Sequence, residues 1–247
     1  YIINSLGNII VEDVIPVDEY EMDASIYFNK YMINTLIDRY TVERANVPLI
    51  NSSLSDLKNI PSSYDSRDYG YITPVKDQAE GGNCWAFAGI ATLEACIKKI
   101  TNITYDLSEE NVKNVMASFS RAGMDLEPNS GGYDSMFMGY LTNWLGPTLE
   151  EYDAYDDLSS ISVPFDAEFH VQNIYFLPER EKGVNDDLYK KAIMDYGAVS
   201  ITIYIPNYYS TNIIGWDDNY NDFDSFGRYT EGAWMYKNIW NSEWKNN

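Results

Sequence analysis

The chain has 247 residues, of which 45% are hydrophobic, and a formal net charge of −21. This length and apolar content suit one compact unit with a substantial core. The strong negative charge argues against nucleic acid as a partner, since phosphate binding depends on Lys and Arg. No stretch is long and apolar enough to span a membrane, and no signal peptide is recognisable. No cofactor motif is found, and the densest acidic group, residues 217–224, lacks the glycine and glutamate of a calcium-binding loop.

Residues 1–60 form an N-terminal extension. Within it, Asp18–Val42 has partly helical spacing of apolar residues, and Asn46–Leu57 is polar and loop-like.

The segment from Gln78 to Phe87 places a cysteine where a protein would build a nucleophile. Two glycines allow a tight backbone approach just before Cys84, and Trp85–Ile100 has the pattern of a helix. The unsatisfied N–H groups and the positive dipole at a helix start favour the thiolate form of a cysteine. The second cysteine, Cys96, lies twelve residues along the same helix, about 18 Å away at the helical rise. The two are therefore too far apart for a disulfide, and Cys96 is expected in the core.

Further helices are expected from Ser108 to Phe119, over Asp134–Trp144 and over Asp186–Tyr196, because each has apolar residues at helical spacing. Strands are expected at the three runs rich in β-branched and aromatic residues, namely His170–Leu177, Ala198–Ile205 and Gly232–Lys237. Helices followed by a strand-rich part predict the α+β class.

The spacing of Gln78 and Cys84, followed by Trp85-Ala-Phe, resembles the papain family of cysteine proteases. The resemblance implies a two-lobed fold, with a helical lobe at about 75–145 and a strand-rich, barrel-like lobe at about 146–247 that includes the strand 61–74. It implies that Cys84 is the nucleophile, supported by Trp85, and that Gln78 and the Cys84 N–H hold the oxyanion. Residues 61–247 would then be the peptidase domain.

Other motifs in the chain extend this resemblance. Gly131-Gly132 resembles the glycine pair that binds the substrate backbone in the family, and Gly82 is assigned to the same surface. The stretch Lys237–Asn241 resembles the family motif in which Asn238 orients the catalytic imidazole and Trp240 shields that contact. Departures are Ile239 and Asn241 in this motif, Gly81 where many members carry a disulfide cysteine, and Asn83 in place of Ser or Gly.

The catalytic histidine of the family has no counterpart in the printed sequence. The single histidine, His170, precedes a predicted strand and is expected to be structural or on the surface, whereas the family spacing lands on Tyr209, just before Ser210. Either the base has been replaced or deleted, or a loop that carries it is absent from the printed sequence. The second explanation is favoured because too few residues separate Val199 from Gly215 for two strands and the excursion between them.

The resemblance predicts a cysteine endopeptidase that hydrolyses peptide or protein substrates through a thioacyl intermediate on Cys84. Two alternatives remain open: an inactive papain-like surface or adhesion module, and a transglutaminase-like acyltransferase. Residues 1–60 are either a prosegment packing on the same chain or a structural extension. The sequence around Gly215-Trp216 resembles that of bacterial and methanogen cell-surface members of the papain family, so an extracellular or surface location is expected.

Overall fold

The computed structural model describes residues 59–163, 165–171, 174–178, 180–205, 207–223 and 229–240. The expectations for residues 1–58 and 241–247 lie outside these ranges. Among the described helices, none combines the length and the apolar character needed to cross a membrane.

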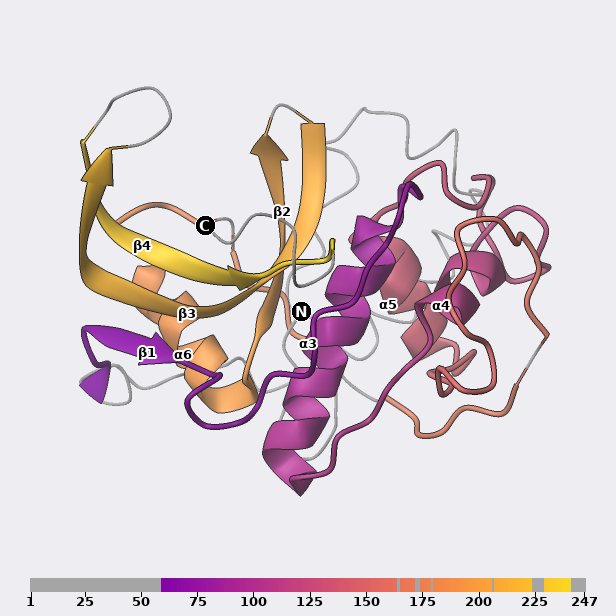
Figure 1. Cartoon of the computed structure of the whole chain (residues 1–247), viewed down its shortest axis with the longest axis horizontal. Helices are drawn as coiled ribbons and strands as arrows, with labels where there is room; N and C mark the ends of the chain where they lie inside the picture. Colours follow the sequence, from indigo (N-terminus) through magenta and orange to yellow (C-terminus); the bar gives the residue numbers. More distant parts are fainter. Residues whose placement is uncertain are drawn as a thin grey trace, which may run out of the picture.

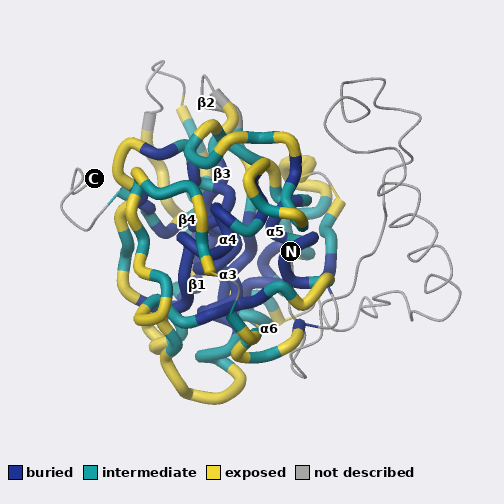
Figure 2. Tube along the Cα trace, turned by 90° about the vertical axis from the view of Figure 1, so that its right-hand side faces the viewer, coloured by how far each residue is buried: buried dark blue, intermediate teal, exposed yellow. Residues whose placement is uncertain are grey.

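A long helix, α3 (Cys84–Thr101), occupies the centre of the molecule. In Figure 1 it stands between the sheet on one side and two shorter helices on the other. Because it is covered from both sides, every residue from Trp85 to Cys96 is buried, and the tube in Figure 2 is dark blue through this region. The helix ends at Asn102, which adopts a left-handed conformation and donates its N–H to Lys98 O. The predicted helix beginning at the cysteine is confirmed.

The helical side contains α4 (Glu109–Val115) and α5 (Asp134–Thr142). Ser108 caps α4, because its side chain accepts a hydrogen bond from Asn111 N at 2.9 Å. Both helices are shorter than the sequence predicted. The chain turns after Val115 and Thr142, and Trp144, with a φ of 57°, is incompatible with continued helix. The buried core of this side is formed chiefly by large apolar residues of α3, α4 and α5, including Ile90, Leu93, Val112, Phe137 and Tyr140.

The other side is a four-stranded antiparallel sheet. It consists of β1 (Ser63–Asp65), β2 (Val199–Ile205), β3 (Asn207–Phe223) and β4 (Tyr229–Lys237). The long strand β3 pairs with all three others. The helix α6 (Asp186–Tyr196), predicted with these bounds, contacts β2 and β3 (Figure 1). The arrangement is α+β, as predicted.

Two predicted strands differ from the structure. The strand expected over residues 61–74 is limited to Ser63–Asp65. No ladder strand forms over the described part of His170–Leu177. The apolar side chains of this second run serve a different purpose: Val171 and Ile174 pack into the helical core, and Tyr175 packs into the core under the sheet. The run joins two cores, which requires apolar residues but no strand partner.

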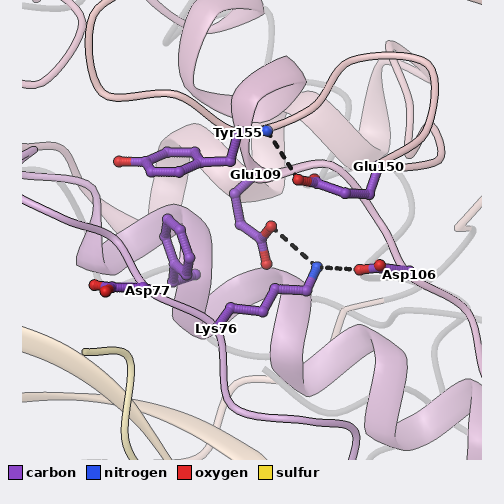
Figure 3. Close-up of a pocket in the computed structure, with 7 residues that line it drawn as sticks. Lys76, Asp77, Asp106, Glu109, Glu150 and Tyr155 are labelled. Carbon is purple, nitrogen blue, oxygen red and sulfur yellow. Dashed lines mark hydrogen bonds and ion pairs between the residues drawn. The ribbon is translucent and has the colours of Figure 1, made fainter. Parts of the chain in front are cut away.

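A charge cluster around the buried carboxylates Glu94 and Glu109 connects the two sides. The Lys76 ammonium lies 3.1 Å from Glu94 Oε1, 3.0 Å from Glu109 Oε2 and 2.8 Å from Asp106 Oδ1; Figure 3 shows the contacts to Glu109 and Asp106. Thr73 donates to Glu94 Oε2 at 2.6 Å and accepts from Lys237 Nζ at 2.9 Å. The segment leading to Gln78 and the end of β4 are thus fastened to α3 and α4.

Glu109 makes the stability of this cluster depend on pH. Burial raises the pKa of Glu109 to about 8, with help from the charges of Glu94 and Glu150 and against the opposing charge of Lys76. An unfolded glutamate titrates near pH 4.3. Between these values the folded chain holds a proton that the unfolded chain has lost, so this group makes stability fall as pH rises from about 5 to 8.

We therefore expect the urea midpoint of unfolding to decrease over this pH range. Glu109→Gln mimics the protonated side chain and should flatten the decrease. An equally steep decrease in Glu109→Gln would mean that the slope comes from the general negative charge of the chain instead.

Candidate active site

Cys84 is the first residue of α3 and is partly exposed. The N–H groups of Ala86 and Phe87 are taken up by Asn83 O at 2.9 and 3.1 Å, so the chain is already in a helical turn at the cysteine. Cys96 is fully buried in the core, as predicted, and forms no disulfide with Cys84. Burial raises the pKa of the Cys96 thiol to about 12, so this thiol stays protonated and unreactive at neutral pH.

The predicted substrate-binding glycines lie against the start of α3. Gly82 donates its N–H to Asn129 O at 3.0 Å, and a Cβ on Gly82 would lie 2.8 Å from Gly131 N. A Cβ on Gly132 would lie 2.3 Å from Nε1 of Trp85, which is almost fully buried. Both close approaches require glycine. The three glycines and Cys84 therefore come together.

Gln78 is 7% exposed and lies next to the end of β4. Its backbone N–H donates to Ile239 O at 2.9 Å, and the neighbouring residue Asp77 forms a β-bridge with Trp240. Its backbone carbonyl accepts from Tyr155 Oη at 2.8 Å. The backbone that carries Gln78 is thus fixed on two sides.

Asn238 and Trp240 lie at the end of β4, beside the Gln78 segment. The side-chain oxygen of Asn238 accepts from the backbone N–H groups of Ile239 at 2.7 Å and Trp240 at 3.1 Å. This is a local turn of the kind that asparagine often makes. Oδ1 of Asn238 therefore stabilises its own turn. The resemblance to the family predicts instead that this oxygen accepts a hydrogen bond from the catalytic imidazole.

Tyr209 occupies the position expected for the base. Its ring stacks on Trp240, with ring centroids 4.9 Å apart and planes 13° from parallel. Burial raises the pKa of Tyr209, and the nearby Cys84 adds to the shift. The phenol therefore keeps its proton at neutral pH and has no capacity to take one from a thiol.

The strands β2 and β3 are joined with almost no connection. Val199 pairs with Ile213 at one end of the hairpin and Ile205 with Asn207 at the other, so a single residue separates the last pair. The commonest hairpin loops have two residues. This one-residue connection is shorter than the loop of a regular hairpin. Tyr209 follows four residues after Ile205, the last residue of β2.

His170 is exposed and stacks on Trp144, with ring centroids 4.4 Å apart. Trp144 follows the C-terminal end of α5, whereas Gly132 and Cys84 lie at its N-terminal end. The nine residues of α5 span about 13 Å at the helical rise. His170 is on the surface, as predicted, and is not brought to Cys84.

Two groups near the site were not singled out from the sequence. Asp134 accepts from Thr202 Oγ1 at 3.0 Å, and Thr202 Oγ1 lies 2.9 Å from Ser210 Oγ, so a polar chain crosses from α5 to β3. Tyr155 reaches Gln78 from a loop 77 residues away. Neither contact has a local sequence signal. Over the described residues, no group of three or more His, Cys, Asp or Glu side chains is placed to hold a metal ion.

Comparison with known proteins gives one family. A family model described as papain family cysteine protease matches residues 60–247. Cathepsin K of Gallus gallus is 28% identical over 202 residues, covering 75% of this chain and 57% of the relative. Procathepsin L of Mus musculus is 29% identical over 214 residues, covering 75% and 58%. The chain thus spans less than two thirds of the length of these relatives.

Solved structures agree with this family. The clostridial cysteine protease Cwp84 after propeptide cleavage is 30% identical, with a TM-score of 0.62, over 73% of this chain and 50% of that one. The protease and lectin-like domains of Cwp84, described as a surface layer associated protein of Clostridium difficile, give 25% identity and a TM-score of 0.61 over 87% and 53%.

Proposed function

Because the chain belongs to the papain family of cysteine proteases, we propose that its site is that of a cysteine endopeptidase with Cys84 as the nucleophile. The observation that carries the proposal is the arrangement of four parts near Cys84: the start of α3, the Gln78 backbone, which Tyr155 links to Asn83, the glycines at 82, 131 and 132, and the end of β4, which binds the Gln78 N–H. In the proposed site, these four parts supply, in the same order, the nucleophile, an oxyanion donor, a surface that binds an extended peptide backbone, and the position of the catalytic base.

The reaction would proceed through a thioester. Cys84 Sγ attacks the peptide carbonyl carbon, and the oxyanion is held by the Gln78 side-chain amide and the Cys84 backbone N–H. The C–N bond then breaks, the amine leaves with a proton, and water hydrolyses the thioester. Peptide backbone along Gly131-Gly132 would present the scissile bond to Cys84.

The cycle needs a group that takes the thiol proton and gives it to the leaving amine. Tyr209 is unsuited because its pKa is raised. We place the base in a loop between Ile205 and Ser210 that the printed sequence does not contain, and the shortness of the β2–β3 connection supports this assignment. Reading the gene between Tyr204 and Trp216 tests it directly: a histidine codon is expected there.

A second candidate is an inactive papain-like surface or adhesion module. It is favoured by the Tyr209 ring, which stacks on Trp240 in the position of the base. The acyltransferase alternative needs a histidine and an aspartate of its own beside Cys84, and His170 stacks on Trp144 at the other end of α5.

Labelling tests the nucleophile. We expect iodoacetamide to modify the native protein at Cys84 and to leave Cys96 unmodified, because Cys96 is fully buried and its pKa is raised. Peptide mapping by mass spectrometry reads out both cysteines, so Cys96 serves as an internal control.

Cys84→Ala should abolish the labelling of the folded protein and any cleavage of an unstructured peptide. Cleavage that persists in Cys84→Ala would rule out the endopeptidase site. Labelling at Cys84 without turnover, together with an uninterrupted Tyr208-Tyr209-Ser210 in the gene, would favour the module.

The proposal extends to the rest of the chain. Residues 1–60 would be a prosegment that packs on the peptidase domain 61–247, and the protein would work outside the cell or on its surface. Two similar structures support this: one is a protease after propeptide cleavage, and the other is described as a surface layer associated protein.

A further inference from the structure

We propose that Tyr155 is a positioning residue for the oxyanion hole, because its hydroxyl holds both chain segments that carry the oxyanion donors. The proposal rests on the proposed function of Gln78 and of the Cys84 N–H. It adds a residue to the site that touches neither substrate nor nucleophile.

One hydroxyl group makes two contacts. Tyr155 Oη donates to the backbone carbonyl of Gln78 at 2.8 Å and accepts from Asn83 Nδ2 at 2.9 Å. Asn83 Nδ2 also donates to Asn129 Oδ1 at 2.6 Å. Since a hydroxyl has one proton and two lone pairs, these two contacts use it as donor and as acceptor at once.

Both contacts bear on oxyanion donors. Gln78 supplies its side-chain amide from the same residue whose carbonyl Tyr155 holds. Asn83 supplies the carbonyl half of the planar peptide unit that contains the Cys84 N–H. A shift of either segment would move one donor away from the oxygen, and donors act only within hydrogen-bond distance of the position that the oxyanion will occupy.

The phenol itself is held in place. The Tyr155 ring meets Phe87 edge to face, with centroids 4.7 Å apart and planes at 87°. Its backbone N–H donates to Glu150 Oε1 at 2.8 Å. Figure 3 shows this contact on the wall of a cavity of about 240 Å³ that is also lined by Asp77, the residue before Gln78. Burial raises the pKa of Tyr155 to about 12, so the hydroxyl keeps the proton that it donates.

Gly81 shows how closely this cluster is packed. A Cβ at this position would lie 2.4 Å from Asn83 Nδ2, 2.8 Å from Asn129 Oδ1 and 2.9 Å from Tyr155 Oη. A larger residue at this position would have to displace these three polar atoms. The cluster of Asn83, Asn129 and Tyr155 therefore packs closely against Gly81.

The test compares two reagents on the full chain. A peptide aldehyde adds to Cys84 as a thiohemiacetal: the S–C bond forms, the thiol proton ends on the former carbonyl oxygen, and nothing leaves. The thiohemiacetal oxygen lies where the oxyanion of the reaction would lie. The affinity for the aldehyde therefore measures how well the oxyanion donors are placed. Iodoacetamide alkylates the same sulfur with loss of iodide and creates no oxyanion, so its rate reports only the nucleophile.

Tyr155→Phe should weaken aldehyde binding by about 10- to 100-fold, somewhat less than the loss of a whole donor, while the rate of alkylation at Cys84 changes by less than about twofold. The matched control is Tyr152→Phe, which removes a hydroxyl from an exposed ring of the same loop and should change neither. Asn83→Ser, which removes the other contact of Tyr155 Oη, should reproduce the selective loss and serves if Tyr155→Phe does not fold.

The outcomes are distinguishable. If the unchanged protein fails to bind the aldehyde, the proposed function is wrong, and the role of Tyr155, which rests on it, is wrong as well. If Tyr155→Phe and Asn83→Ser bind the aldehyde as tightly as the unchanged protein does, the role of Tyr155 is overturned and the proposed function stands. A parallel loss of aldehyde binding and alkylation would assign Tyr155 to general stability and would also overturn the positioning role.

Discussion

Replacing Tyr209 with histidine is expected to raise the rate of peptide hydrolysis by the printed chain about 10²- to 10⁴-fold, the usual contribution of a positioned general base. The phenol holds its proton because its pKa is raised by burial beside Cys84. An imidazole titrates near neutral pH and can therefore accept the Cys84 thiol proton, which the phenol does not accept. The measurement is the initial rate of cleavage of a fluorogenic peptide under reducing conditions.

The site is already shaped for a flat ring at this position. Tyr209 stacks on Trp240 with planes 13° from parallel, and an imidazole would find the same indole face. Asn238 stands two residues before the indole on which Tyr209 stacks, and its oxygen is held in a local turn. To orient the imidazole it must exchange one of these contacts, so Asn238→Ala should reduce the gain in the double variant.

The matched control is Tyr208→His. Tyr208 precedes Tyr209 on β3 and is 80% exposed, and neighbouring residues of a strand point to opposite faces. This control adds the same imidazole on the far side and should leave the rate unchanged. As a second arm, Tyr209→Gly assayed with imidazole in the buffer should recover part of the gain. Equal rates for Tyr208→His and Tyr209→His would show that the position beside Cys84 does not support a base.

The sequence predicted those parts of the molecule that depend on neighbouring residues. The start of α3 and the bounds of α6 follow from local chemistry, namely helix-start geometry and apolar periodicity. The role of Gly131 and Gly132 comes from the family resemblance and stays a prediction. The lack of a histidine beside Cys84 was also evident from spacing, because Tyr209 stands six residues before Gly215.

Long-range contacts explain what the sequence did not predict. The run from His170 has strand-like composition, but its apolar residues are divided between two cores. Tyr155 carries no motif and reaches Gln78 across 77 residues of chain. Lys76 is surrounded by three carboxylates from α3, α4 and the loop between them, and nothing in its local sequence indicates this.

Glu94→Ala is expected to cost about 3–5 kcal/mol of folding free energy, the range for breaking a buried ion pair by removing one partner. The Glu94 side chain is 1% exposed. It accepts from Thr73 Oγ1 at 2.6 Å and from Leu107 N at 2.9 Å, in addition to its contact with Lys76. Alanine would leave these donors without their acceptor in a site that water does not reach. Urea unfolding followed by fluorescence measures the loss.

Asp106→Ala is the control, because it removes another carboxylate from the same ammonium. Asp106 lies 2.8 Å from Lys76 Nζ, closer than Glu94, but its side chain is 69% exposed. An exposed pair contributes about 0–1 kcal/mol, so this variant should be nearly as stable as the unchanged chain. If the two losses are equal, the charge on Lys76 decides the stability. If only Glu94→Ala is strongly destabilised, burial decides it, and the cluster acts as a buried fastening between the Gln78 segment, β4 and the central helix.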